Sequence, residues 1–125
     1  MIQVGTKLQI IDNSGGQVAQ CIRIKRKDRA KVGDTIVVAV QSALPQGITS
    51  NAKHRVKKGD LYPALVIQTK KSINRPDGSS IKNTQNSVIL LTEKGTPLGT
   101  RVTSAFNFEI RKVSLRAWAL TQHAH

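Results

Sequence analysis

Short apolar runs, separated by Gly, Asp, Asn and Pro, follow one another along the chain up to about residue 100. These runs are rich in Val and Ile, which suit the half-buried surface of a strand better than a helix. Five short strands with polar turns are typical of a small closed β-barrel, so the pattern predicts an all-β fold. The predicted strands span about residues 6–12, 17–25, 34–41, 61–70 and 87–92.

Alternation within the second predicted strand assigns side chains to its two faces. Under a period of two, Val18, Ile22 and Ile24 share one face. Cys21 falls on the other face together with Ala19. We interpret Cys21 as a small packed residue and not as a nucleophile.

The turns between the strands have recognisable chemistry. The run Asp12-Asn13-Ser14-Gly15-Gly16 supplies acceptors for an Asx-type turn and two glycines free to take positive φ. Gly33-Asp34 and Gly59-Asp60 each precede an apolar strand. Arg75-Pro76-Asp77-Gly78 matches a type I turn, which predicts a hairpin from about residue 70 to 82.

Two segments depart from the strand-and-turn pattern. Residues 45–58 form a long polar connection, and unstructured loops of that length are usually functional or disordered. From Ser104 onward aromatic and aliphatic residues return, which favours one or two short helices packing on the barrel end. We expect one domain over residues 1–125, with the barrel at about 1–102 and a C-terminal tail at about 103–125.

The charge of the chain points to a polyanionic partner. Twenty Lys and Arg face seven Asp and Glu, which gives a formal net charge of +13. Such self-repulsion weakens a compact state unless a polyanion neutralises it. No apolar stretch approaches the roughly 20 residues that span a bilayer, and no basic amphipathic helix is evident. These observations favour nucleic acid over a membrane as the partner.

The basic residues gather in four groups. No long basic helix is available to enter a DNA major groove, and aromatic residues for base stacking are scarce. Backbone-dominated binding of folded RNA remains, although a solvated basic turn is the alternative interpretation of the first group. The candidate RNA contacts are Arg23, Lys25, Arg26, Lys27, Arg29 and Lys31; Lys53, His54, Arg55, Lys57 and Lys58; Lys70, Lys71, Arg75 and Lys82; and Arg101, followed by Arg111, Lys112 and Arg116.

Catalytic and metal-binding interpretations find little support. The single cysteine cannot form an internal disulfide, and no signal peptide is evident, which favours a reducing internal compartment. His123 and His125 lie at the chain end without a third ligand nearby. Residues 95–101 lack the spacing of a phosphate-binding loop. We therefore expect no enzyme activity, no cofactor and no metal.

Seven short motifs follow one another along the chain. They are Asp12-Asn13-Ser14-Gly15, Val32-Gly33-Asp34, Val56-Lys57-Lys58-Gly59-Asp60, Thr69-Lys70-Lys71, Arg75-Pro76-Asp77-Gly78-Ser79, Val88-Ile89-Leu90-Leu91 and Leu98-Gly99-Thr100-Arg101. Their order and spacing resemble those of the universal large-subunit ribosomal protein fourteen family. The resemblance covers about residues 1–102, and its specificity lies in the order and spacing of motifs that are individually weak.

This resemblance implies a five-stranded barrel with a small C-terminal helical region. It also implies binding to large-subunit rRNA near the subunit interface, contact with small-subunit rRNA in intersubunit bridges, and contact with neighbouring ribosomal proteins. The sequence departs from the family pattern at a longer loop over residues 45–55, at Asn83 and Thr84, and in a shorter tail after Val102. The longer loop looks like that of fungal mitochondrial members.

Two functional hypotheses follow from the sequence. The first is a structural constituent of the large ribosomal subunit, in the mitochondrial matrix or alternatively in the bacterial cytoplasm or a plastid. The second is a free-standing barrel-type RNA-binding or RNA-chaperone module. The charge excess and the long basic loop argue against the second, because both are costly without permanent neutralisation.

Overall fold

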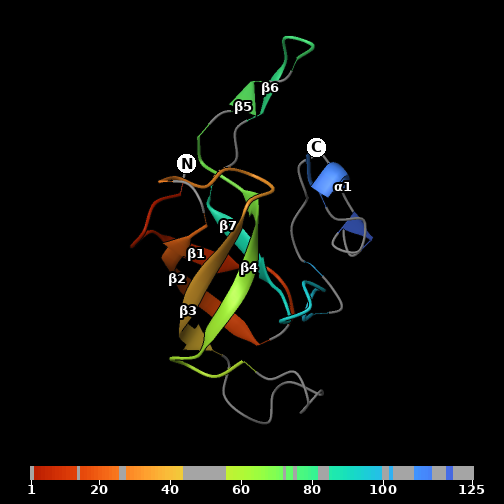
Figure 1. Cartoon of the computed structure of the whole chain (residues 1–125). Helices are drawn as coiled ribbons and strands as arrows, with labels where there is room; N and C mark the ends of the chain where they lie inside the picture. Colours follow the sequence, from red (N-terminus) through yellow and green to blue (C-terminus); the bar gives the residue numbers. More distant parts are fainter. Residues whose placement is uncertain are drawn as a thin grey trace.

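Five strands close into a barrel in the computed structural model (Figure 1). The structure describes residues 2–13, 15–25, 28–43, 56–71, 73–74, 76–81, 85–99, 102, 109–113 and 118–119. The barrel order is β1-β2-β3-β4-β7. The strands are β1 (Lys7–Ile10), β2 (Gly16–Ile24), β3 (Thr35–Ala43), β4 (Leu61–Gln68) and β7 (Ser87–Leu90). The predicted all-β barrel is confirmed, and each predicted strand range overlaps one of these strands.

A parallel pairing closes the barrel. Successive strands from β1 to β4 pair antiparallel, as does β4 with β7. The first and last strands, β1 and β7, pair parallel, with Gln9 opposite Ser87 and Ile10 opposite Val88. Beyond this pairing, the buried Asp12 accepts a hydrogen bond at Oδ2 from the amide of Leu90 at 3.1 Å. Closure thus leaves no free edge among the five strands.

The predicted hairpin between the fourth and fifth barrel strands is confirmed. Short strands β5 (Ile73–Asn74) and β6 (Ser80–Ile81) pair antiparallel, and the hairpin projects beyond one end of the barrel (Figure 1). In its turn, Gly78 has a φ of 88°, a conformation that favours glycine. Asp77 Oδ1 accepts hydrogen bonds from the amide of Ser79 at 3.0 Å and its hydroxyl at 2.7 Å.

The barrel wall is apolar on both faces where β4 and β7 run. Along β4, Ala64 and Val66 face the interior cluster, whereas the alternating Leu65 and Ile67 join a second cluster outside. The same alternation in β7 places Ile89 outside. Because strands buried on both faces read as continuous apolar runs, this explains the unbroken apolar stretches of the two strands.

The C-terminal region covers this outer wall. Helix α1 (Glu109–Val113) buries Ile110 completely in the outer cluster, and Trp118 packs against the same cluster. The predicted helical segment is therefore confirmed. The outer cluster joins Ile110 to Val32 of the β2–β3 loop as well as to Leu65, and a Cβ at Gly33 would lie 3.0 Å from Val113 Cγ2. Helix α1 therefore packs where the side of the barrel meets the end at which β2 leads into β3.

The predicted faces of β2 are partly wrong. Ala19 and Cys21 are buried in the interior cluster, and Ile24 packs against that cluster on the same side. Ile22, in contrast, is 43% exposed. The register of β2 against β3 shifts between Cys21 and Arg23. Such a bulge inserts an extra residue, which reverses the alternation beyond it.

The sequence predicts that both glycines of the turn at residues 12–16 can take positive φ, and one of them does. Gly15 has a φ of 101°. Gly16 is instead the first residue of β2, where a Cβ would lie 2.7 Å from Ile10 Cδ1 and 3.5 Å from Val56 Cγ1. Gly16 is thus required for close packing and not for positive φ.

Candidate nucleic-acid interface

The first basic group follows the end of β2 and the loop to β3. Arg29 and Lys31 are exposed, whereas the alternating Ala30 and Val32 are buried. Ala30 also exchanges two backbone hydrogen bonds with Ile2, at 2.8 and 2.7 Å. The buried residues therefore anchor the loop and direct its cations to solvent.

Arg23 and Lys25 at the end of β2 are exposed as well. Together with Arg29 and Lys31 they form what we call the basic ridge. Arg26 and Lys27, also predicted as contacts, lie outside the residues that the structure describes.

The group at Lys70 and Lys71 lies at the same end of the barrel as the basic ridge. Lys70 and Lys71 are exposed just after β4. The β2–β3 loop is tied to this end of β4, because Gly33 donates to the carbonyl of Val66 at 2.9 Å and Val66 donates to that of Asp34 at 3.0 Å. The fold therefore unites two groups that are far apart in sequence. Arg75 and Lys82 of the predicted hairpin group lie outside the described residues.

The group at Lys57 and Lys58 lies at the opposite end of the barrel. Lys57 and Lys58 are exposed, and the following Gly59 donates to the carbonyl of Val40 at 2.7 Å. From Asp34 to Val40 along β3, at about 3.3 Å per residue, this end is roughly 20 Å from the basic ridge. Lys53, His54 and Arg55 lie outside the described part of the chain.

The turn after β7 joins the end that carries Lys57 and Lys58. Leu98 donates to the carbonyl of Leu90 at 2.9 Å and packs against the interior cluster that contains Val56. Gly99 lies against Asp12 and Asn13 of the β1–β2 turn. The loop ending at Lys58 and the turn over residues 95–99 thus share one end of the barrel. Arg101 is outside the described residues.

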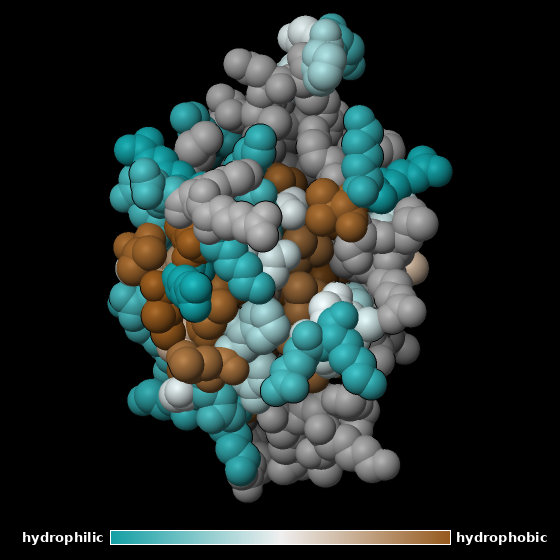
Figure 2. Space-filling view, in the orientation of Figure 1, coloured by the Kyte–Doolittle hydropathy of each residue, from teal (hydrophilic) through white to brown (hydrophobic). Residues whose placement is uncertain are grey.

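Sequence clustering missed two exposed lysines, Lys7 on β1 and Lys94 in the turn after β7. Neither has a basic neighbour in the sequence, so no local pattern identifies them. On α1, Arg111 and Lys112 are exposed. On the face drawn in Figure 2, hydrophilic residues surround apolar residues of the barrel wall.

Replacing Gly99 by Ala should destabilise the end of the barrel that carries Lys57 and Lys58. The added methyl would lie 2.7 Å from Asn13 Oδ1 and 3.0 Å from Asp12 Cβ, and Asp12 is held by Leu90. We expect a loss of about 1–3 kcal/mol in the free energy of unfolding, measured by urea denaturation. The matched control is Lys94→Ala, an exposed site in the same segment. Equal losses for both variants would show that the contact at Gly99 relaxes without cost.

Tyr62 and Asp60 form a polar contact beside the exposed pair Lys57 and Lys58. The Tyr62 hydroxyl donates to Asp60 Oδ2 at 3.3 Å. Burial raises the pKa of Tyr62, and the charge of Asp60 and its hydrogen bond raise this pKa further. Because the neutral phenol is favoured in the folded state, this stabilisation is complete below the ordinary pKa near 10 and is lost as pH rises through the folded-state value.

Titration of Tyr62 should therefore give a midpoint above 10.0. This residue is the one tyrosine of the chain, so phenolate absorbance reports it alone. In Asp60→Asn the midpoint should fall, although burial should keep it above that of the unfolded chain. An unchanged midpoint in this variant would contradict the role of Asp60.

Cys21 is packed inside the barrel, as expected. It is 1% exposed, and burial raises the pKa of its thiol, while a hydrogen bond involving the backbone of Arg23 lowers it in part. A buried protonated thiol is a poor nucleophile. Among the residues that the structure describes, no three His, Cys, Asp or Glu side chains group as metal ligands. No helix in the described part is long and apolar enough to cross a membrane.

The chain matches the family model of ribosomal protein L14p/L23e over residues 1–123. The match covers nearly the whole chain. The chain belongs to this family. The match extends past residue 102, where the resemblance of the individual motifs ends, and includes most of the C-terminal tail.

Membership of the L14p/L23e family makes this chain a structural ribosomal protein that binds rRNA. It also implies association with the ribosome and contact with ribosomal proteins of the large subunit. Members of such families are typically structural and not enzymatic. The exposed cations at both ends of the barrel match this function, because phosphate neutralisation supplies much of the affinity for nucleic acid.

Proposed function

We propose that the chain joins rRNA at two separate ends of its barrel. The observation that carries this proposal is the division of the basic groups: the basic ridge with Lys70 and Lys71 at one end, and Lys57 and Lys58 at the other. The first end holds large-subunit rRNA. The second end, with residues 45–58 and the turn over residues 95–101, faces the subunit interface and contacts small-subunit rRNA in an intersubunit bridge.

The proposed rRNA contacts come from all four sequence groups. In each described loop, buried neighbours such as Ala30, Val32 and Val56 hold the backbone while the cations face solvent. The full set is Arg23, Lys25, Arg26, Lys27, Arg29, Lys31, Lys53, His54, Arg55, Lys57, Lys58, Lys70, Lys71, Arg75, Lys82 and Arg101.

We further propose that the chain acts as one unit over residues 1–125 in a mitochondrial large subunit. The outer cluster supports a single unit, because it joins Ile11, Leu65 and Ile89 of the barrel region to Ile110 of α1. The expanded loop over residues 45–55 supports the mitochondrial particle over a bacterial or plastid one.

Gradient sedimentation of organelle and whole-cell lysates tests the proposed assignment. The chain should sediment with large subunits and with joined ribosomes, and it should be enriched in the mitochondrial fraction. A chain that stays in light fractions would support the free-standing RNA-binding module. A chain that follows only cytoplasmic or plastid ribosomes would contradict the mitochondrial assignment alone.

Reversing the charge of Lys57 and Lys58 should weaken subunit joining. Negative charges at this end would face rRNA phosphate, so we expect the association constant of the subunits to fall at least about tenfold. Light scattering at limiting Mg²⁺ measures joining, and large subunits should keep normal amounts of the variant. Lys7→Glu with Lys112→Glu is the matched control, since both lysines are exposed and lie outside the proposed interface. Equal joining by the two double variants would contradict the bridge.

A further inference from the structure

An apolar area lies on the outer face of β2, β3 and β4. It consists of Ile22 of β2, Val37 and Ala39 of β3, and Leu61 and Pro63 of β4, and we call it the side patch. Ile22 is 43% exposed and Leu61 is 62% exposed, and the residues between them are half-buried. Figure 2 shows apolar surface over the part of the barrel where Figure 1 places β2 and β3. The outward face of an antiparallel sheet is usually polar where it meets only water, so this face is unusual.

Strand pairing places the residues of the side patch next to one another. Val37 lies opposite Pro63 in the register of β3 with β4, and Ala39 lies opposite Leu61. On the other side of β3, Ile22 falls at the bulge of β2, which leaves it exposed. Neighbouring strands are about 4.8 Å apart, so the side patch is roughly 10 Å wide across the three strands. Apolar residues that gather on a surface in this way mark an interaction site, whereas single exposed ones do not.

The side patch is poor in charge. Twenty of the 125 residues are Lys or Arg, yet Arg23 is the one charged residue within the described strands β2, β3 and β4. Interfaces with nucleic acid are strongly positive, whereas the centre of a protein–protein interface is depleted in charge. The cations at the two ends of the barrel therefore suit rRNA, and the uncharged side between them suits a protein.

Polar groups beside the side patch already have partners. Gln41 Nε2 donates to Gln20 Oε1 at 2.5 Å, and Gln20 Nε2 donates to the carbonyl of Gly5 at 3.3 Å. Gln20 lies opposite Ala39 in the pairing of β2 with β3. Burying a polar group is costly mainly when the group is left without a hydrogen bond. A partner can therefore cover this border while each of the two amides keeps a hydrogen bond.

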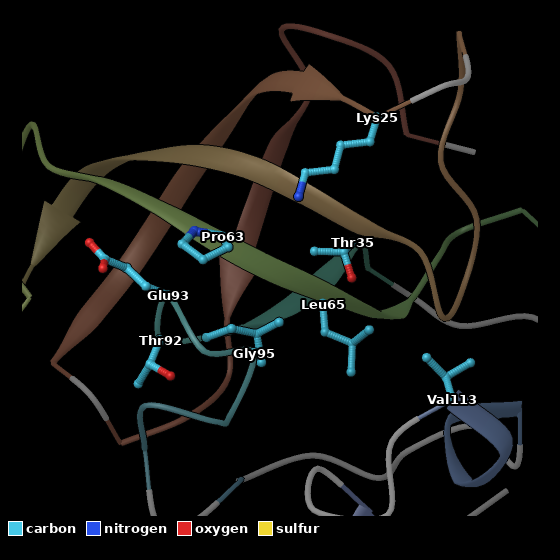
Figure 3. Close-up of a pocket in the computed structure, with 9 residues that line it drawn as sticks. Lys25, Thr35, Pro63, Leu65, Thr92, Glu93, Gly95 and Val113 are labelled. Carbon is cyan, nitrogen blue, oxygen red and sulfur yellow. The ribbon is translucent and has the colours of Figure 1, made fainter.

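Beyond Pro63 the outer face leads into a hollow of about 240 Å³ (Figure 3). Thr35 and Pro63 line the hollow from the strands, and Val113, which is 53% exposed, lines it from α1. In Figure 3 the Lys25 side chain extends across β3 toward Pro63, so the basic ridge borders the hollow. An apolar cavity of about 150 Å³ accepts a benzene-sized group, so the hollow has room for one large apolar side chain.

We propose that the side patch binds a short uncharged segment of a neighbouring large-subunit ribosomal protein, an inference that rests on the ribosomal function proposed above. Family membership implies contact with ribosomal proteins, and the side patch is the surface whose chemistry fits such a contact. Charge complementarity requires an uncharged segment, because a charge buried against Val37 and Leu61 would lack a partner.

Size restricts the contact to one segment of that protein. A standard interface buries about 800 Å² on each partner, so a surface roughly 10 Å wide holds a strand or a loop and not a whole domain. One apolar side chain of the segment enters the hollow beside Pro63 and Val113.

A diazirine analogue of leucine at position 61 tests the proposal in intact large subunits. On irradiation it should join the chain to one ribosomal protein, and mass spectrometry should place the link in an uncharged segment of that protein. In Ile22→Ser the yield of this link should fall about fivefold, as expected when an apolar contact at the centre of an interface is lost. The matched control is Val4→Ser, because Val4 is 64% exposed and lies in the turn before β1, outside the side patch. It should leave the yield unchanged in particles that hold equal amounts of the chain.

Failure of this inference differs from failure of the proposed function. If the chain is in large subunits and position 61 links only to rRNA, to a second copy of the chain or to nothing, the inference is wrong and the rRNA-binding function stands. An unchanged yield in Ile22→Ser, or an equal loss in Val4→Ser, would also overturn it. If the native chain is absent from large subunits, the proposed function fails and the protein contact at the side patch fails with it.

Discussion

Replacing Arg23, Arg29 and Lys31 of the basic ridge by Gln should reduce rRNA affinity by about 100-fold at 0.15 M salt. Each phosphate contact contributes roughly 0.7–0.9 to the slope of log K against log salt concentration, so three lost contacts should flatten it by about 2–3. Filter binding of the full chain to large-subunit rRNA across a salt series measures both quantities. The expected effect is large because a duplex carries one phosphate charge about every 1.7 Å.

A double variant with the same net charge separates the basic ridge from overall charge. Lys7 and Lys94 are exposed and lie outside the four sequence groups, and Lys7→Glu with Lys94→Gln lowers the net charge as much as the ridge variant does. This double variant should change the slope by less than about one. Identical slopes for the two variants would show that affinity depends on net charge alone. Neither variant should lose much stability, because exposed substitutions usually change it by less than about 0.5 kcal/mol each.

Ile110→Ala should lower the free energy of unfolding by about 2–5 kcal/mol. Ile110 is fully buried in the outer cluster, where it joins α1 to the wall formed by Leu65 and Ile89. Its truncation leaves a cavity between the helix and the barrel that rigid strands cannot fill. Urea denaturation followed by circular dichroism gives the loss.

Fluorescence distinguishes local undocking of the helix from global destabilisation. Trp118 is the single tryptophan and packs against the same outer cluster. In Ile110→Ala its emission should shift to the red before the barrel unfolds. Val113→Ala in the same helix is the control, because Val113 is 53% exposed and should cost less than about 1 kcal/mol. Losses below that level for Ile110→Ala would mean that docking of α1 contributes little to stability.

The strand positions could be predicted because each strand has a local cause. The run from Leu61 to Gln68 is rich in β-branched and aliphatic residues and follows a turn at Gly59. The hairpin at residues 73–81 follows from Pro76, Asp77 and Gly78, whose conformational preferences act within a few residues. Such preferences need no partner far along the chain.

The sequence assigned side chains of β2 to the wrong face where a bulge in the pairing with β3 interrupts the alternation. Sequence alternation places Ile22 with Ile24, but the bulge between Cys21 and Arg23 separates their environments. A bulge depends on the register against β3, and that register involves residues some 15 positions away. Likewise, Gly16 resembles a turn glycine in sequence, and only the position of Ile10 shows that it serves packing.

The sequence identified the basic residues of the candidate interface, but it did not show how the fold places them relative to one another. Charge and motif order identified an RNA-binding ribosomal protein, and the family match confirmed this. The sequence could not group the basic ridge with Lys70, because backbone bonds from Gly33 and Val66 bring these segments together. Nor could it reveal the hollow around Pro63, whose walls come from distant segments.

By itself, then, the sequence determined the strands, the excess of positive charge and the family, since all three are properties of composition or of residues close together in the chain. Only the tertiary structure decided that β1 and β7 close the barrel, that α1 covers its side and that the cations occupy two opposite ends. The physical reason is that these features depend on pairing and burial between segments that are far apart in the sequence. Where each segment packs depends on the apolar surface and the unpaired strand edges that the other segments present.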